Sequence, residues 1–318
     1  MHIALLEPLG ISAERVQELA RPLMEAGHSF TSFDTKTTDP AELTRRAAGA
    51  EVVMIANNPL PAEVIRALPD LKMIAVAFTG IDHVALDVCR ERGITVCNCA
   101  GYSDVAVAEL TVGLAIDVLR QVAAGDAAVR GCGTNAGLTG REIAGKTVGI
   151  VGTGHIGTRA GRLFSAFGAR VLGYARHENP EATAAGIEHV DLETLLHESD
   201  IVSLHLPLND ATRKSFDADK IAQMKPDAVF INCARGAIVG NDALAQALTE
   251  GRIAGAGIDV FDAEPPIDAD YALLKAPNTI FTPHVAFLTE EAMARRAVIE
   301  FGNVSAWAAG TPENVCPL

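Results

Sequence analysis

The sequence lacks the features that would place the chain in a membrane or outside the cell. No uncharged apolar run approaches the roughly 20 residues that a transmembrane helix needs. The first ten residues, MHIALLEPLG, have no basic segment ahead of their apolar run and soon reach Glu7 and Pro8, so a secretory signal peptide is not expected. CNC at 97–99 lacks the CxxC spacing of a zinc or redox site, and the six cysteines form no disulfide framework. We therefore expect a cytoplasmic protein with reduced cysteines and no bound metal.

Positive charge is also in short supply. The chain has 26 Lys and Arg against 40 Asp and Glu, which gives a formal net charge of −14. Such a surface disfavours general binding to nucleic acid or to an anionic membrane, and neither is expected as a partner. The 318 residues suggest about two domains. A hydrophobic share of 49% and a charged share of 21% are typical of a globular chain that buries a large core.

Short apolar runs alternate with helical patterns from end to end. Near-continuous apolar strands separated by helices predict mostly parallel sheets covered on both faces. The first series predicts strands at 2–8, 28–34, 50–57, 71–78 and 93–98. The second series predicts strands at 147–152, 170–175, 200–206, 228–234, 253–260 and 278–283. The fold class is therefore α/β, with two doubly wound, Rossmann-like or flavodoxin-like domains.

A longer helical pattern at 104–125 interrupts this alternation. It is too long for a crossover in the first series, so a domain junction is predicted near 100–103. The glycine-rich stretch at 130–140 predicts a surface loop that leads into the second domain.

The second domain should carry a site at one edge of its sheet. Ligands of an open parallel sheet bind outside the carboxyl ends of the strands. The segments just past those ends are 152–157, 175–176, Pro207, 234–235, 259–264 and 283–284. They would bring together an arginine, two or three carboxylates and a histidine, which is a set that chance rarely gathers at one edge.

GTGHIG at 152–157 follows a predicted strand and begins a predicted helix. In this context the GxGxxG pattern indicates a dinucleotide site, whereas a purely structural turn is the alternative. Gly152 permits the tight turn, Gly154 lets the backbone approach a pyrophosphate, and Gly157 lets the helix pack on the strand. The N–H groups of the helix start, at His155 and Ile156, would face the pyrophosphate. The His155 side chain is expected to be exposed and not catalytic.

The carboxylate that usually holds the adenosine ribose is missing. About twenty residues after the glycines, where an Asp or Glu is usual, the strand ends in Ala175, followed by Arg176 and His177. An aspartate would repel a 2′-phosphate, whereas Ala175 leaves space and Arg176 can pair with it. The sequence therefore predicts NADP(H) as the favoured cofactor, with NAD(H) possible. The alternative is that Arg176 points to solvent and both cofactors are used.

Three side chains are the candidates for catalysis. Arg235, in NCARG, suits two-pronged capture of a carboxylate, although a surface arginine is the alternative. Glu264 lies in DVFDAEP, where a solvated acidic turn is the alternative and Asp262 the competitor. His284 lies in TPH, and a lone histidine after a strand is often only packed or exposed. Their expected meeting at one edge favours a catalytic role for all three.

These motifs, in this order and over essentially the whole chain, resemble those of the D-isomer-specific 2-hydroxyacid dehydrogenases. The resemblance implies that Arg235, Glu264 and His284 match the family's catalytic trio, and that the protein is a homodimer. It also implies a discontinuous substrate-binding domain, 1–101 with 286–318, and a dinucleotide-binding domain, 102–285, with the active-site cleft between them. The last helix, around 290–310, would return to pack on the first α/β unit. NADPH-using glyoxylate and hydroxypyruvate reductases of the family show a similar small residue followed by arginine.

The resemblance implies an oxidoreductase that reduces a small unphosphorylated 2-oxoacid. Arg235 would grip the substrate carboxylate with the N–H groups of Gly80 and Ile81, in AFTGIDH, while His284 donates a proton to the carbonyl oxygen. Glu264 would fix the His284 ring and raise its pKa. The expected substrate pocket also includes Phe78, Thr79, Tyr102 and Phe287. The expected cofactor contacts also include His205, Pro207, Thr212, Cys233, Ala234 and Asp259, the last at the nicotinamide carboxamide.

The sequence departs from the family pattern in places. The family often has a tryptophan in the loop at 130–140, and this chain has none there. VAFLTEE at 285–291 resembles the D-lactate and D-2-hydroxyisocaproate branch. The phosphoglycerate branch carries an arginine near the equivalent of 56–61, where this chain has Asn57, Asn58 and no cation, and no C-terminal regulatory domain is expected. A phosphorylated substrate is therefore not expected.

Two other functions remain open at this point. Formate dehydrogenase-like or phosphite dehydrogenase-like enzymes share the fold, but formate dehydrogenases have glutamine where this chain has Glu264. The corepressors of this superfamily use dinucleotide binding as a switch. An assay of cofactor oxidation with a panel of 2-oxoacids separates an enzyme from a switch.

Overall fold

The computed structural model describes residues 1–263 and 266–318. The chain divides into two compact units. The first unit holds residues 1–103 and 288–318, and the second unit holds residues 104–287. Of the helices in the described residues, none is long and apolar enough to cross a membrane.

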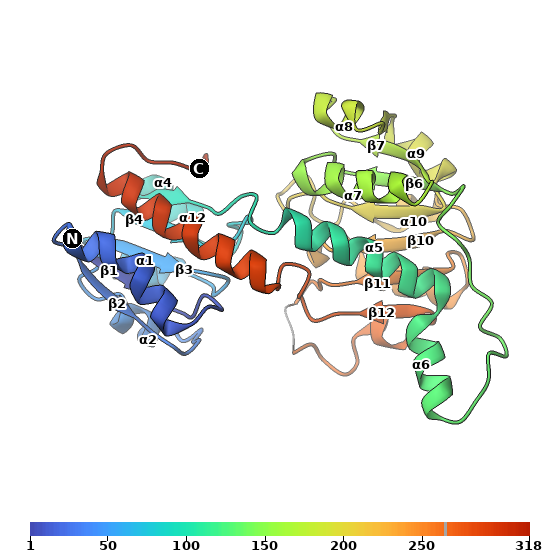
Figure 1. Ribbon diagram of the computed structural model, residues 1–318, viewed down its shortest axis with the longest axis horizontal. Coiled ribbons are helices and arrows are strands. Elements are labelled where there is room, and N and C mark those ends of the chain that lie inside the picture. Colours follow the sequence, from blue (N-terminus) through green and yellow to red (C-terminus); the bar gives the residue numbers. More distant parts are fainter. Residues whose placement is uncertain (264–265) are drawn as a thin grey trace. The chain divides into compact units, whose positions relative to one another are not determined.

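The first unit is built on a five-stranded parallel sheet (Figure 1). Its strands are β1 (His2–Leu5), β2 (Ser29–Ser32), β3 (Val52–Ile55), β4 (Met73–Val76) and β5 (Thr95–Cys97). The order β2-β1-β3-β4-β5 places β1 between β2 and β3, so the chain reverses its direction of travel across the sheet there. The carboxyl ends of β1 and β3 are therefore the topological switch point of this unit, where ligands of such sheets bind.

Five helices cover this sheet. They are α1 (Ala13–Glu25), α2 (Pro40–Arg46), α3 (Ala62–Arg66), α4 (Leu86–Arg92) and α12 (Glu290–Ala308). Their ends follow the usual rules, because the Ser12 and Asp39 side chains cap α1 and α2, and Gly93 ends α4 in the left-handed conformation. The last helix, α12, packs on α1 and β4, so the chain returns to the first unit at its end.

The second unit has a seven-stranded parallel sheet in the order β12-β11-β10-β9-β6-β7-β8. Its strands are β6 (Thr147–Val151), β7 (Arg170–Tyr174), β8 (Glu188–His189), β9 (Ile201–Leu204), β10 (Val229–Asn232), β11 (Gly255–Ile258) and β12 (Thr279–Phe281). This is the Rossmann order with one further strand, and its switch point lies between β6 and β9. The expected α/β class with two parallel sheets is confirmed.

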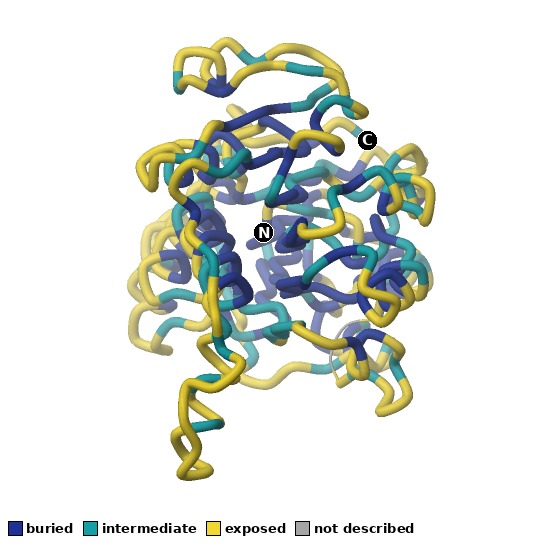
Figure 2. Tube along the Cα trace, turned by 90° about the vertical axis from the view of Figure 1, so that its right-hand side faces the viewer, coloured by how far each residue is buried: buried dark blue, intermediate teal, exposed yellow. Residues whose placement is uncertain are grey.

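Helices cover both faces of this second sheet. They are α5 (Asp104–Arg120), α7 (His155–Ala166), α8 (Pro180–Ala184), α9 (Leu192–Glu198), α10 (Ala218–Ala222) and α11 (Asn241–Thr249), whereas α6 (Val122–Arg130) extends from the end of α5 and buries no residue. The strands supply alternate side chains to two cores. Ile150 and Ile231 pack with α5 and α7, whereas Val151 and Phe230 pack with α9 and α11. In Figure 2 the dark blue, buried segments lie mostly inside the trace, and many of the outer loops are yellow.

Two elements differ from the expectation. The single helix predicted at 104–125 is two helices, because Gln121 takes a left-handed conformation with φ of 52° and α6 begins after it. The short strand β8 was not predicted, because its two exposed residues carry no apolar signal.

Candidate functional site

The glycine-rich turn after β6 has three glycines with different reasons to be glycine. Gly152 has φ of +103°, and a Cβ there would lie 2.5 Å from the His205 carbonyl oxygen. A Cβ at Gly157 would lie 2.0 Å from the Gly152 carbonyl oxygen. A Cβ at Gly154 would meet no atom of the described residues within 4 Å. Packing within the protein therefore requires the first and third glycines, while the second leaves open space beside the backbone.

That open space lies at the start of α7, a helix of 12 residues whose N-cap is Gly154. Glycine supplies no capping side chain, so the first N–H groups of the helix, together with the positive end of its dipole, can accept an anion. His155 is exposed, and its Nδ1 lies 3.9 Å from Asp104 Oδ2 on α5. The donors and the space fit the pyrophosphate of a dinucleotide.

The end of β7 lies next to this turn, because the Gly152 N–H donates to the Tyr174 carbonyl at 2.8 Å. Ala175 is half-buried, and Arg176 and His177 are exposed. Neither Arg176 nor His177 makes a hydrogen bond or ion pair with the residues the structure describes. An arginine and a histidine, with no carboxylate at Ala175, thus stand directly after the strand that neighbours the glycine turn.

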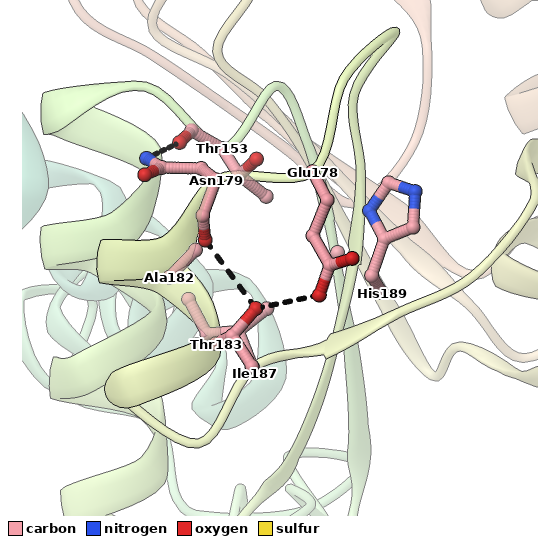
Figure 3. Close-up of a pocket in the computed structure, with 8 residues that line it drawn as sticks. Thr153, Glu178, Asn179, Ala182, Thr183, Ile187 and His189 are labelled. Carbon is pink, nitrogen blue, oxygen red and sulfur yellow. Dashed lines mark hydrogen bonds between the residues drawn. The ribbon is translucent and has the colours of Figure 1, made fainter.

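A small pocket lies beside this strand end, between α8 and β8 (Figure 3). Asn179 caps α8 and donates from Nδ2 to the Thr153 carbonyl at 2.6 Å, which ties the segment after β7 to the glycine turn. Glu178, the first carboxylate after Arg176, accepts from the Thr183 hydroxyl at 2.9 Å. The sequence prediction missed these residues, although Asn179-Pro180 is itself a helix-start signal.

The end of β9 forms the other side of the switch point. The His205 N–H donates to the Val151 carbonyl at 2.7 Å, and its Nε2 lies 2.9 Å from Ser203 Oγ. Burial lowers the pKa of His205 to about 4, so the ring is neutral at neutral pH. Pro207 is exposed, and the Thr212 hydroxyl donates to its carbonyl at 2.6 Å.

Arg235 is presented by a structured turn after β10. The buried Asn232 side chain accepts from the Ala234 N–H at 3.0 Å and donates to the Arg235 carbonyl at 3.1 Å. Gly236 is required next, because a Cβ there would lie 1.9 Å from the Phe261 carbonyl carbon. Arg235 is half-buried and its Nη1 donates to the Ala234 carbonyl at 2.9 Å. Cys233 is buried, and this raises the pKa of its thiol.

His284 is held by Asp259, which follows β11 and is fully buried. The Asp259 carboxylate accepts from the Thr282 hydroxyl at 2.6 Å, the Val285 N–H at 2.8 Å and the Ala286 N–H at 2.9 Å. The His284 N–H donates to the Asp259 carbonyl at 2.8 Å, and His284 has a left-handed φ of 55°. The expected contact of Asp259 with a nicotinamide carboxamide stays a prediction, and what the structure shows is an anchor for residues 282–286.

Two further catalytic expectations concern the segment after Asp259. Glu264 lies outside the described residues. Its competitor Asp262 accepts from the Tyr271 hydroxyl at 2.7 Å. The ring of Phe287, expected in the substrate pocket, meets the His284 ring edge-on at 5.4 Å between centroids.

The other expected substrate residues belong to the first unit. Phe78 and Tyr102 are buried, with their ring centroids 5.9 Å apart. Thr79 is exposed and Gly80 and Ile81 are half-buried in the loop after β4. That loop is a turn in which the Val84 N–H donates to the Ile81 carbonyl at 3.1 Å.

One expectation is wrong. The sequence predicts no cation beside Asn57, but the Lys36 ammonium, from the loop after β2, donates to Asn57 Oδ1 at 2.8 Å. Lys36 Nζ also lies 3.7 Å from Glu7 Oε2. Sequence separation hid this cation, because β2 and β3 lie on opposite sides of β1 and only the folded sheet brings their loops together.

Comparison with known proteins shows the family to which the chain belongs. The family described as D-isomer specific 2-hydroxyacid dehydrogenase, NAD binding domain, matches residues 112–286. The chain belongs to this family. A glycerate dehydrogenase of Methylorubrum extorquens is 38% identical over 296 residues, which cover 91% of this chain and 92% of the relative.

Solved structures of similar proteins hold both kinds of nicotinamide cofactor. An acyclic imino acid reductase in complex with NADPH and D-Arg has a TM-score of 0.89 and 28% identity, over 100% of both chains. The D-lactate dehydrogenase of Aquifex aeolicus, complexed with NAD and lactic acid, has a TM-score of 0.84 and 28% identity over 97% of this chain and 96% of that one. For this 2-hydroxyacid dehydrogenase family member, a nicotinamide dinucleotide is therefore the supported cofactor class.

Proposed function

We propose that the protein reduces small 2-oxoacids to D-2-hydroxyacids. The observation that carries this proposal is the edge of the second sheet. Arg235, His284 and the α7 N-terminus all follow the carboxyl ends of parallel strands of one sheet, and such ends lie at the same edge. A carboxylate-binding cation, a proton donor and a pyrophosphate cradle are the groups that this reaction needs.

The chain's own residues supply binding and proton transfer. Arg235 pairs with the substrate carboxylate through its planar guanidinium and orients the adjacent carbonyl. His284 donates a proton from its ring to the carbonyl oxygen. A reduced nicotinamide dinucleotide supplies the hydride when bound. Glu264 is proposed to hold the far ring nitrogen of His284 and so to fix the orientation of the ring.

Residues of the first unit are proposed to hold the second carboxylate oxygen of the substrate and to line most of its side-chain pocket. The N–H groups of Gly80 and Ile81 would hold the second carboxylate oxygen. Phe78, Thr79 and Tyr102, with Phe287 of the second unit, would line the side-chain pocket. His205, Pro207, Thr212, Cys233, Ala234 and Asp259 are proposed to border the cofactor.

A panel of 2-oxoacids with NADPH and with NADH tests the activity directly. His284→Gln should keep cofactor affinity and lower kcat roughly 10²- to 10⁴-fold, because only the proton donor is removed. Arg235→Lys should instead raise KM for the oxoacid. If no 2-oxoacid is reduced while the cofactor binds, a corepressor-like switch replaces the proposed enzyme. If His284→Gln retains more than a tenth of kcat, another residue donates the proton.

The proposed cofactor preference is NADP(H) over NAD(H). It rests on Ala175, which leaves space at the end of β7, and on Arg176 and His177, whose exposed side chains can meet a 2′-phosphate. Ala175→Asp should lower kcat/KM for NADPH relative to NADH by about tenfold or more, since a carboxylate repels the phosphate. Arg162→Met, at an exposed residue of α7, is the matched control. A wild-type preference of tenfold or more for NADH contradicts the proposal.

A homodimer is also proposed, with the cytoplasm as its location. None of the nine residues of helix α6 is buried. Two of its apolar side chains, Val122 and Val129, are 52% and 74% exposed. In Figure 1 this helix projects from the end of α5. A second copy would cover such apolar side chains. Light scattering should give twice the chain mass, and Val129→Glu should shift it toward the monomer.

A further inference from the structure

A polar cluster in the first unit lies outside the residues assigned so far. It consists of Glu7, Lys36, Asn57 and Asn58. Glu7 follows β1, Lys36 follows β2, and the two asparagines follow β3, so all four lie at the carboxyl ends of neighbouring strands. The ends of β1 and β3 form the switch point of this sheet, which is where an α/β sheet binds its ligands.

Glu7 is fully buried, but only one of its two carboxylate oxygens accepts hydrogen bonds from the described residues. Its Oε1 accepts from the Ala56 N–H at 2.7 Å and from the Asn58 N–H at 2.8 Å. Its Oε2 has no hydrogen-bond partner among the described residues and faces the Lys36 ammonium at 3.7 Å. A buried carboxylate oxygen without a donor is costly, so a nearby positive charge is needed to offset it.

Lys36 is presented by a fixed loop. The Asn58 side chain donates to the Thr37 carbonyl at 3.0 Å, and Arg46 donates to the Thr35 hydroxyl at 2.8 Å, so both neighbours of Lys36 are tied down. The Lys36 side chain is 54% exposed. An ammonium has three N–H groups, of which one meets Asn57 and one faces Glu7. The third can donate to a ligand.

The cluster is joined to the loop expected to hold the substrate carboxylate. His83 Nε2 lies 3.0 Å from the Ala56 carbonyl oxygen, and the Leu60 N–H donates to the His83 carbonyl at 2.9 Å. These contacts link residues 56–60 directly to residues 79–84. A small substrate held at Gly80 and Ile81 would therefore extend its other end along the same edge of the same unit.

We propose that Lys36 is a specificity-determining residue that selects 2-oxoacids with a hydroxyl group on carbon 3. This inference rests on the proposed 2-oxoacid reduction and names its substrate class. Lys36 donates the hydrogen bond to the hydroxyl oxygen, and Asn57 and Glu7 fix the position of the ammonium.

The charge of the cluster distinguishes a hydroxyl from the alternatives. Glu7 neutralises Lys36, so the pair offers a dipole and no net positive charge to a phosphate group. An alkyl group would leave the third ammonium N–H without a partner and displace water from it. A neutral hydroxyl accepts one hydrogen bond and leaves the Lys36–Glu7 pair intact.

Three 3-carbon oxoacids that differ only at carbon 3 test this inference. They are pyruvate, hydroxypyruvate and phosphohydroxypyruvate, each assayed for kcat/KM with NADPH and NADH. The wild type should prefer hydroxypyruvate to both others. Lys36→Met should lower the ratio of hydroxypyruvate to pyruvate by about five- to tenfold, chiefly through KM, because a partly exposed charged hydrogen bond is lost. Lys36→Arg, which keeps a cationic donor, should retain most of the ratio.

A second Lys–Glu pair of the same sheet gives the matched control. Lys72 donates to Glu51 at 2.6 Å at the opposite edge, before β4 and β3. Lys72→Met should leave the ratio unchanged. Glu7→Gln removes the neutralising charge and keeps an acceptor for the two N–H groups, so it should raise phosphohydroxypyruvate relative to hydroxypyruvate about tenfold.

The outcomes separate this inference from the function on which it rests. An unchanged ratio in Lys36→Met, an equal fall in Lys72→Met, or a wild-type preference for pyruvate or phosphohydroxypyruvate overturns the role of Lys36 while oxoacid reduction stands. If none of these or other 2-oxoacids is reduced, both proposals fall. Should Glu7→Gln not fold, the Lys36→Met and Lys36→Arg pair decides alone.

Discussion

The two parallel sheets of this protein differ in the groups that line their switch points. In the second unit the ends of β6 and β9 are lined by backbone, with glycines at 152, 154 and 157 and the open start of α7. In the first unit the ends of β1 and β3 are lined by side chains, with Glu7 buried beneath Asn57 and Lys36. Backbone donors suit a pyrophosphate, which is common to all dinucleotides, whereas side chains can change to suit one substrate.

Among the variants considered for the two switch points, Gly157→Ala is expected to lower stability most. A Cβ there would lie 2.0 Å from the Gly152 carbonyl oxygen, and backbone cannot move aside as a flexible side chain can. Gly157→Ala should lower the free energy of unfolding of the second unit by about 3 kcal/mol or more. Denaturant unfolding followed by circular dichroism measures this, and cofactor affinity should fall with it.

Gly154→Ala is the matched control, because the added methyl group meets no described atom within 4 Å. Stability should change by less than about 1 kcal/mol, since φ at Gly154 is an ordinary −73°. Cofactor affinity should nevertheless fall more than tenfold, because the methyl group takes the space that the pyrophosphate needs. Equal destabilisation by the two variants would show that Gly154 is also a packing glycine.

This contrast explains how far sequence reasoning reaches. The glycine turn, Arg235 and His284 could be predicted because each follows a strand within a short local motif, and parallel strand ends share an edge. Lys36 could not, because its partners Glu7 and Asn57 are 29 and 21 residues away and no local pattern links them. The anchoring of residues 282–286 by Asp259 was missed for the same reason, since its partners follow 23 to 27 residues later.

Asp259 is a side-chain anchor within the second unit, and its substitution tests whether side chains position the site there as well. Asp259→Asn keeps one acceptor oxygen but replaces the other with an NH₂ group. That NH₂ group would face another donor, either the Ala286 N–H or the Thr282 hydroxyl and Val285 N–H. The free energy of unfolding should fall by about 2 kcal/mol. Because His284 lies between these donors, kcat should fall more than tenfold and its pH profile should shift, while affinity for reduced cofactor is retained.

The opposite edge of the same sheet supplies the control for this prediction. Asp200 lies just before β9 and accepts from the N–H of Thr147, the first residue of β6, at 2.8 Å and from Lys225 at 3.0 Å. Asp200→Asn should lower stability without a change in the pH profile of kcat. If both variants affect only stability, Asp259 is structural and does not position His284. If Asp259→Asn instead weakens cofactor binding alone, the nicotinamide contact is its main role.

An effect that depends on pH is expected at Glu300, which lies on α12 in the first unit and is fully buried. Burial raises the pKa of its carboxyl group well above the ordinary value, and nearby Glu7 adds to the rise while Arg296 opposes it. The folded protein therefore holds a proton that the unfolded chain releases above about pH 4.5. Stability should fall as the pH rises from there, by at most about 1.4 kcal/mol per pH unit, until the folded carboxyl itself ionises.

Glu300→Gln should remove this dependence, because the amide cannot ionise. The difference between variant and wild type should be small near pH 4.5 and grow in favour of the variant at higher pH. Trp307, the one tryptophan of the sequence, lies on the same helix and donates to the hydroxyl of Thr95 in β5, so its fluorescence follows the unfolding of this unit. Glu291→Gln, at an exposed position of α12, is the control and should leave the slope as it is. Parallel stability curves for wild type and Glu300→Gln between pH 5 and 8 would show that Glu300 is ionised in the folded state, and that Arg296 offsets its burial.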